Sequence, residues 1–252
     1  MNEKMGALFV TLFLGVFIVI GAMISFMVQK KQKFLDFSLA FAFSVILMLL
    51  FTDLLPEASE TLGNEHFLLF LLFIIGGIFV LRILDFFIPD HEEKRHTKKC
   101  EKDNLFHIGF IASIALVLHN IIEGMAIYST CISSLRTGII ISLGVGCHNI
   151  PLGMVITSTL YQNNQSKKKI LMIILGLMLS TFVGGMIMFF MNGDSLNEIF
   201  VGTLLSLTIG MLIYICTNEL YPKIRKSNNK KTCIYGILAG VILITFTCFL
   251  GG

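Results

Sequence analysis

The chain has 252 residues, of which 55% are hydrophobic and only 14% are charged. A soluble domain carries about 25% charged residues, so an ordinary soluble protein is excluded, and the small net charge of +3 gives no sign of a nucleic-acid partner. The charges are clustered and leave long apolar stretches, without the alternating polarity of a membrane β-barrel. The sequence therefore predicts an all-α, polytopic membrane protein.

Eight apolar segments are long enough to cross a bilayer as helices. The first is too long for a signal peptide and lacks a small-residue cleavage site, so we expect it to be retained. The chain, 1–252, is then a single transmembrane domain with a short charged loop at about 89–104. In chain order the segments cover about 6–28, 34–55, 67–88, 105–129, 136–160, 170–192, 198–220 and 232–250.

Basic residues alternate between the connecting loops. Most of the 19 Lys and Arg residues fall in the loops after the first, third, fifth and seventh segments. Cytosolic loops are rich in Lys and Arg, so this asymmetry predicts that these four loops face the cytosol and that both termini lie outside. The regular alternation also supports the count of eight.

The charged loop between the third and fourth segments carries His91, His96 and Cys100, and His107 follows just beyond it. Imidazole and thiolate bind borderline-soft cations, so transient metal capture at the inner mouth is one interpretation. A solvated loop without a metal role is the other, because no spacing there resembles a structural zinc site.

A nine-residue motif occurs twice inside the apolar region, as HNIIEGMAI from His119 and as HNIPLGMVI from His148. His119 and Glu123 are four residues apart, so they share one helix face and can both reach one ion. Asn120 flanks that face, and His148 with Asn149 could complete the metal shell from the next helix. Ionisable residues inside a span usually mark a pathway, so the motif predicts a divalent-metal site. A simple His119–Glu123 pair in a packed bundle is the alternative.

The motif copies also carry packing signals. Gly124 and Gly153 follow Glu123 and Leu152, and because small residues allow close approach, we expect the two motif helices to pack together there. Pro151 is expected to bend its helix and to free a carbonyl beside the site. Consecutive helices run antiparallel, so the two copies point in opposite directions, as in an inverted repeat with a site near the midplane.

With these motifs the sequence resembles the ZIP (Zrt/Irt-like) family of divalent-metal transporters over essentially its whole length. The matching features are the eight spans, HNIIEG, HNIPLG, LLPEA at 54–58 and NELYP at 218–222. The resemblance implies an inverted 3+2+3 helix arrangement and import of zinc, iron, manganese or a similar ion across the plasma membrane into the cytosol. The partners would be the transported metal ions and the lipid bilayer, and a homodimer is left open.

The resemblance also implies a role for each of a set of residues. The metal ligands would be His119, Asn120, Glu123, His148 and Asn149. The outer mouth would hold Asp53 and Glu57, with Met48 as either a thioether contact or a packing residue, and the inner exit would hold Asp85, Asn218 and Glu219.

Two positions depart from the family pattern. Leu152 stands where the family commonly has Glu, and Thr181 stands where the sixth segment of the family often has a further Glu. The resemblance implies two metal positions along the pathway, and both changes remove anionic ligands from the second of them. We therefore expect one central metal site rather than two, with Glu123 offsetting half the charge of a divalent ion.

Three functions remain open on sequence alone. The main hypothesis is an importer that works by alternating access, with uptake that weakens in acid because protons compete with metal for the imidazoles. A non-transporting metal-binding or sensing relative is the alternative. An intramembrane metal hydrolase is the third, but the sequence contains neither HExxH nor an independent general base, so we expect that the chain is not an enzyme.

Overall fold

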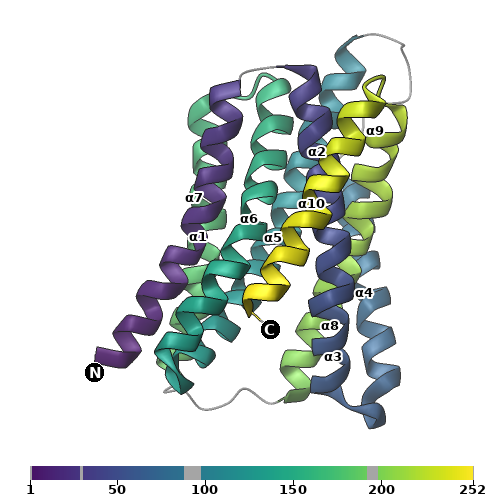
Figure 1. The fold of residues 1–252 in the computed structure, drawn as a ribbon. Coiled ribbons are helices and arrows are strands. Elements are labelled where there is room, and N and C mark those ends of the chain that lie inside the picture. Colours follow the sequence, from purple (N-terminus) through teal and green to yellow (C-terminus); the bar gives the residue numbers. More distant parts are fainter. Residues whose placement is uncertain (1, 29–30, 88–97, 192–197, 252) are drawn as a thin grey trace.

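Residues 2–28, 31–87, 98–191 and 198–251 are described by a computed structural model. Throughout these ranges the regular structure is helical, and eight helices are long and apolar enough to cross a membrane, which confirms the predicted fold class. The elements are α1 (Asn2–Val28), α2 (Gln32–Leu49), η1 (Leu50–Leu54), α3 (Leu55–Leu62), η2 (Asn64–His66), α4 (Phe67–Phe87), α5 (Lys98–Ser133), α6 (Leu135–Gln162), α7 (Lys167–Phe190), α8 (Glu198–Tyr214), η4 (Ile215–Leu220), α9 (Tyr221–Lys226) and α10 (Lys230–Gly251) (Figure 1).

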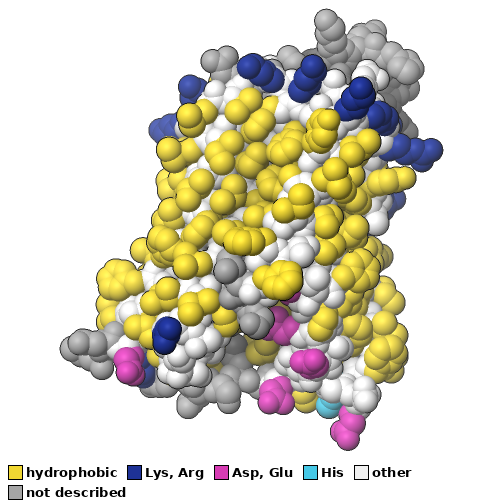
Figure 2. Space-filling view, viewed as in Figure 1, with side chains coloured by type: hydrophobic (Ala, Val, Ile, Leu, Met, Phe, Trp, Pro, Cys, Tyr) yellow, Lys and Arg dark blue, Asp and Glu magenta, His cyan; other side chains and the backbone are white. Residues whose placement is uncertain are grey.

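Charge divides the two ends of the helix bundle. On the face drawn in Figure 2, Lys and Arg side chains gather at the upper end, acidic side chains lie toward the lower end, and a broad apolar band separates them. The N-terminus lies at the lower end (Figure 1). Because basic residues concentrate on the cytosolic side of a membrane, this distribution agrees with the predicted orientation, in which the upper end faces the cytosol and the lower end faces outward.

The contacts between helices show the same pattern in the first and in the second half of the chain. α1 packs on α6 and α5 packs on α7, while α2 packs on α10 and α4 packs on α8. The first three spans contain α1, α2 and α4, and the last three contain α7, α8 and α10. If these are exchanged in order, and α5 is exchanged with α6, the α1–α6 pair becomes the α7–α5 pair and the α2–α10 pair becomes the α8–α4 pair. The pairing is therefore that of the inverted 3+2+3 arrangement, with α5 and α6 at its centre.

The two motif glycines do not pack against each other, so that expectation was wrong. A Cβ atom on Gly153 would lie 2.1 Å from the backbone oxygen of Ile18 on α1, and one on Gly124 would lie 1.9 Å from the backbone oxygen of Thr181 on α7. The glycines instead seat α6 on α1 and α5 on α7. α5 and α6 still contact each other, through the side that carries the histidines.

Each glycine contact is reciprocated by a glycine on the partner helix. Gly21 on α1 faces the backbone oxygen of Ile150, and a Cβ atom there would lie 2.1 Å from it. Gly21→Ala should therefore force α1 and α6 apart and lower the free energy of unfolding by about 1–3 kcal/mol. Thermal unfolding of the detergent-purified protein measures this change.

Gly176→Ala is the matched control for this substitution, because Gly176 is exposed on α7 and a Cβ atom there would meet nothing within 4 Å. Alanine favours helix relative to glycine, so the control should keep or slightly raise the unfolding temperature. Equal unfolding temperatures for the two variants would contradict the close packing of α1 on α6.

The second and seventh spans run further than the sequence predicts. Their apolar patterns stop just before Pro56 and Pro222, but the helices continue to Leu62 and Lys226. Each proline lies in the first turn of a new α-helical segment, α3 or α9, which follows a π-helical turn, η1 or η4. Proline is tolerated in that position because the first turn of a helix does not need its N–H group.

Candidate metal centre

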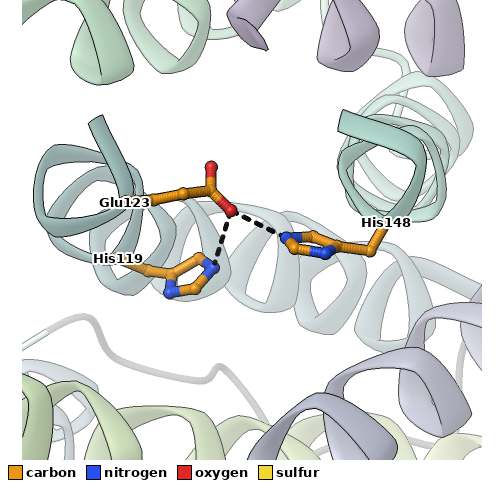
Figure 3. A group of neighbouring side chains, drawn as sticks. All are labelled: His119, Glu123 and His148. Carbon is orange, nitrogen blue, oxygen red and sulfur yellow. Dashed lines mark hydrogen bonds and ion pairs between the residues drawn. The ribbon is translucent and has the colours of Figure 1, made fainter. Parts of the chain in front are cut away.

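Three ligand-type side chains meet between α5 and α6 (Figure 3). The Nε2 atom of His148 lies 2.7 Å from Oε1 of Glu123, and Nε2 of His119 lies 3.7 Å from the same oxygen. One ligand atom from each residue lies within 4.8 Å of the other two. The three side chains are only 5–8% exposed, so they form a compact, buried set of two imidazoles and one carboxylate.

Helix geometry accounts for this meeting. His119 and Glu123 share one face of α5 because they are four residues apart, and α6 brings His148 to that face from the opposite side (Figure 3). Elsewhere in the described part of the chain, no three His, Cys, Asp or Glu side chains come this close. Two imidazoles and a carboxylate are donors that suit zinc and other divalent transition metals.

The buried polar atoms favour a metal site over a simple His–Glu pair. Nε2 of His119 is buried and has no hydrogen-bond partner among the described residues. Leaving such an atom unsatisfied costs about 1–3 kcal/mol, whereas a metal ion would use its lone pair. The structure therefore leaves the Nε2 atom of His119 without a hydrogen bond from the protein, beside the carboxylate of Glu123.

The two asparagines of the motifs make different contacts. Asn149 donates a hydrogen bond from Nδ2 to Oε2 of Glu123 at 3.0 Å, so it holds one carboxylate oxygen while the other faces the imidazoles. Asn120 donates from Nδ2 to the backbone oxygen of Leu177 at 3.2 Å, and thereby ties α5 to α7. The Oδ1 atoms of both asparagines are buried without a hydrogen-bond partner in the structure as described.

Comparison with known proteins gives the family. A family model described as ZIP zinc transporter matches residues 88–247, which include both motif copies and the whole histidine–carboxylate cluster. The chain belongs to the ZIP zinc transporter family. The resemblance that the motifs suggested is therefore confirmed.

Relatives of this ZIP protein match it over nearly its full length. The zinc transporter ZupT of Streptococcus mutans is 30% identical over 242 residues, covering 92% of each chain. ZupT of Chlorobium phaeovibrioides is 31% identical over 264 residues, covering 99% of each chain. ZupT of Clostridium perfringens is 28% identical over 280 residues, covering 99% of this chain and 97% of its own. The likeness therefore extends over nearly the whole chain.

The predicted outer-mouth residues of this ZIP protein lie on η1 and α3. Asp53 and Glu57 are both exposed. Acidic side chains gather toward the same end of the molecule (Figure 2), and such a concentration of negative charge attracts cations.

The residues assigned to the inner exit lie on α4 and η4. Asp85 accepts a hydrogen bond from the hydroxyl of Tyr214 at 2.5 Å. Asn218 is exposed, and its amide donates to the backbone oxygen of Tyr214 on its own helix at 3.3 Å. Glu219 is 7% exposed. The structure therefore gives Asp85 and Asn218 protein partners and places Glu219 in the buried part of η4.

Two other predicted pathway residues lie among packed helices. Thr181 is fully buried, and its hydroxyl donates to the backbone oxygen of Thr11 on α1 at 3.0 Å. With the Gly124 contact described above, it forms a junction of α1, α5 and α7. Met48 is half-buried on α2. Neither belongs to the cluster of His119, Glu123 and His148.

Most of the charged loop between the third and fourth spans, at about 89–104, lies outside the described residues. His91 and His96 lie outside the described residues, as do the side chains of Cys100 and His107. α5 begins at Lys98, so the last part of the predicted 89–104 loop is helical. Metal capture by these four residues stays a prediction.

Sequence reasoning missed an apolar cavity next to the metal cluster. Its lining includes Leu116 of α5, Leu152 of α6 and Ile215 of η4. Leu116 and Leu152 lie about one helical turn from His119 and His148, toward the cytosolic end. Each belongs to an ordinary apolar run, and only the fold brings them together as an apolar wall on the inner side of the site.

Proposed function

We propose that this ZIP protein imports zinc and related divalent transition metals into the cytosol through one central site on α5 and α6. The observation that carries the proposal is the buried cluster of His119, Glu123 and His148, inside a bundle whose basic end marks the cytosol. The printed names of the ZupT relatives, all zinc transporters, support zinc as the cargo. The proposed location is the plasma membrane, as a multi-pass protein.

The geometry supports a sequence of steps for the ion. Asp53 and Glu57 attract a hydrated cation at the outer mouth. The two neutral imidazoles and Glu123 then replace part of its water shell, and the carboxylate offsets half of its charge. Release to the cytosol requires the apolar wall around Leu152 to separate, so the site opens to one side at a time. The outer and inner residues thus act at different stages of one alternating-access cycle.

Metal flux into proteoliposomes tests the proposal. Purified protein should support saturable zinc influx, and zinc should compete with cadmium, cobalt, iron and manganese in a graded order that defines the selectivity. Liposomes without protein give the background rate. Zinc binding without zinc movement would instead identify a sensor, and hydrolysis of a membrane amide or ester would indicate an enzyme.

Asn149 is proposed to position Glu123 through the hydrogen bond to Oε2. Asn149→Ala should raise the KM for zinc uptake by about 10–100-fold, because loss of a residue that orients a metal ligand typically weakens binding by that factor. Asn120→Ala is the matched control, since Asn120 binds a backbone oxygen of α7 instead. It should lower thermal stability more than zinc affinity, and the reverse pattern between the two variants would contradict these roles.

A further inference from the structure

The π-helical turn η4 forms part of the wall that separates the metal cluster from the cytosol. Ile215 and Leu220, its first and last residues, line the apolar cavity together with residues of α2, α5 and α6. Both side chains are only 1% exposed. η4 is therefore one of the elements that would separate if the cluster opened toward the cytosol between these helices.

The backbone of η4 is held in its unusual register by side chains of its own. A π-helical turn shifts hydrogen bonds by one residue and leaves carbonyl groups in need of other donors. The Thr217 hydroxyl donates to the backbone oxygen of Ile213 at 2.8 Å, and Asn218 donates to that of Tyr214. π-helical turns are rare and are often found at functional sites.

Tyr214 anchors the start of η4 to a neighbouring helix. It is the last residue of α8, is 2% exposed, and donates its hydroxyl to Oδ2 of Asp85 on α4 at 2.5 Å. Arg82 lies 3.9 Å from the same carboxylate oxygen. A hydrogen bond to an ionised carboxylate is stronger than one between neutral groups, so this contact fixes the position at which η4 begins.

We propose that Tyr214 is a positioning residue for transport, and that its hydrogen bond to Asp85 holds η4 against α2 and α5 and keeps the cytosolic side of the metal site closed. This inference rests on the proposed import of metal, because it assigns Tyr214 and η4 to the inner gate of that pathway. Loss of the hydroxyl should free η4 to open more often, while the metal ligands on α5 and α6 remain in place.

Cys216 reports the position of η4 directly, since it lies within the turn and is 2% exposed. The experiment uses inside-out membrane vesicles, a water-soluble maleimide, and a variant whose other cysteines are replaced by serine or alanine. Tyr214→Phe should increase the labelling rate of Cys216 by about tenfold or more, the effect of losing a hydrogen bond to a charged group. Tyr235→Phe, on the exposed side of α10, should leave the rate unchanged. An unchanged or slower rate in Tyr214→Phe would overturn the proposal.

Asp85→Asn provides an independent variant if Tyr214→Phe folds poorly. Asparagine keeps an acceptor oxygen but loses the charge, so labelling of Cys216 should rise by a smaller factor, and a rate at or below that of the parent protein would overturn the proposal. In proteoliposomes, Tyr214→Phe should change Vmax of zinc influx several-fold and leave KM within about twofold. If Tyr214 had only a structural role, the labelling rate of Cys216 would stay unchanged. Faster labelling of Cys216 in a protein that moves no zinc would reject the import function, but it would still support the role of Tyr214 and η4 in closing the cytosolic side of the metal site.

Discussion

Replacement of Glu123 by glutamine should lower zinc uptake at least about 100-fold, since removal of a ligand should cost no less than removal of a group that orients one. Glutamine keeps the shape of the side chain and one oxygen, but it carries no charge to offset that of the ion. The cluster is buried, so water does not compensate for this loss. The initial rate of radioactive zinc uptake by intact cells, normalised to the amount of transporter in the membrane, measures the effect.

Two further substitutions define the specificity of this result. His119→Ala should reduce uptake to a similar extent, because it removes the imidazole whose buried Nε2 atom makes no hydrogen bond to the protein. Glu198→Gln, at the exposed start of α8, should leave uptake unchanged. Normal uptake in both Glu123→Gln and His119→Ala would show that the metal site has been assigned to the wrong residues.

Leu152→Glu should raise the number of zinc ions bound per chain from one to two. Leu152 occupies the position in the second motif copy that Glu123 occupies in the first, and it is 3% exposed beside the site. A carboxylate there is costly to bury unless a cation neutralises it, so zinc should stabilise this variant against unfolding more than it stabilises the wild type. Elemental analysis and zinc-dependent unfolding temperatures measure the two effects.

Leu152→Gln separates charge from packing in that experiment. It introduces a polar side chain of similar size, so it should lower stability in the same way but bind one zinc ion per chain. If Leu152→Glu also binds a single ion and its metal selectivity matches that of the wild type, the leucine does not explain the expected single site.

Much of the fold follows from the sequence because its signals are local. A bilayer requires long apolar helices, and the alternation of basic loops sets their direction, so the eight spans and their orientation are predictable. The pairing of His119 with Glu123 also follows from a spacing of four along one helix. The antiparallel course of two consecutive helices then places His148 opposite them, and Figure 3 shows this arrangement.

Features that depend on a third helix were not predictable in this way. Gly124 and Gly153 signal close packing, but the sequence does not say with which neighbour, and their partners turned out to be α7 and α1. Pro56 and Pro222 indicate the ends of apolar helices, yet the preceding π-helical turns let both helices continue. The separate contacts of Asn120 and Asn149 likewise depend on which backbone or carboxylate each amide meets in the folded bundle.

Zinc content and X-ray absorption of the purified protein, saturated with zinc and freed of excess metal, test the central claim most directly. The structure predicts one zinc ion per chain, with two imidazole nitrogens and at least one carboxylate oxygen in its coordination shell. Two tightly bound ions per wild-type chain, or a shell without imidazole, would contradict a single central site built from His119, Glu123 and His148.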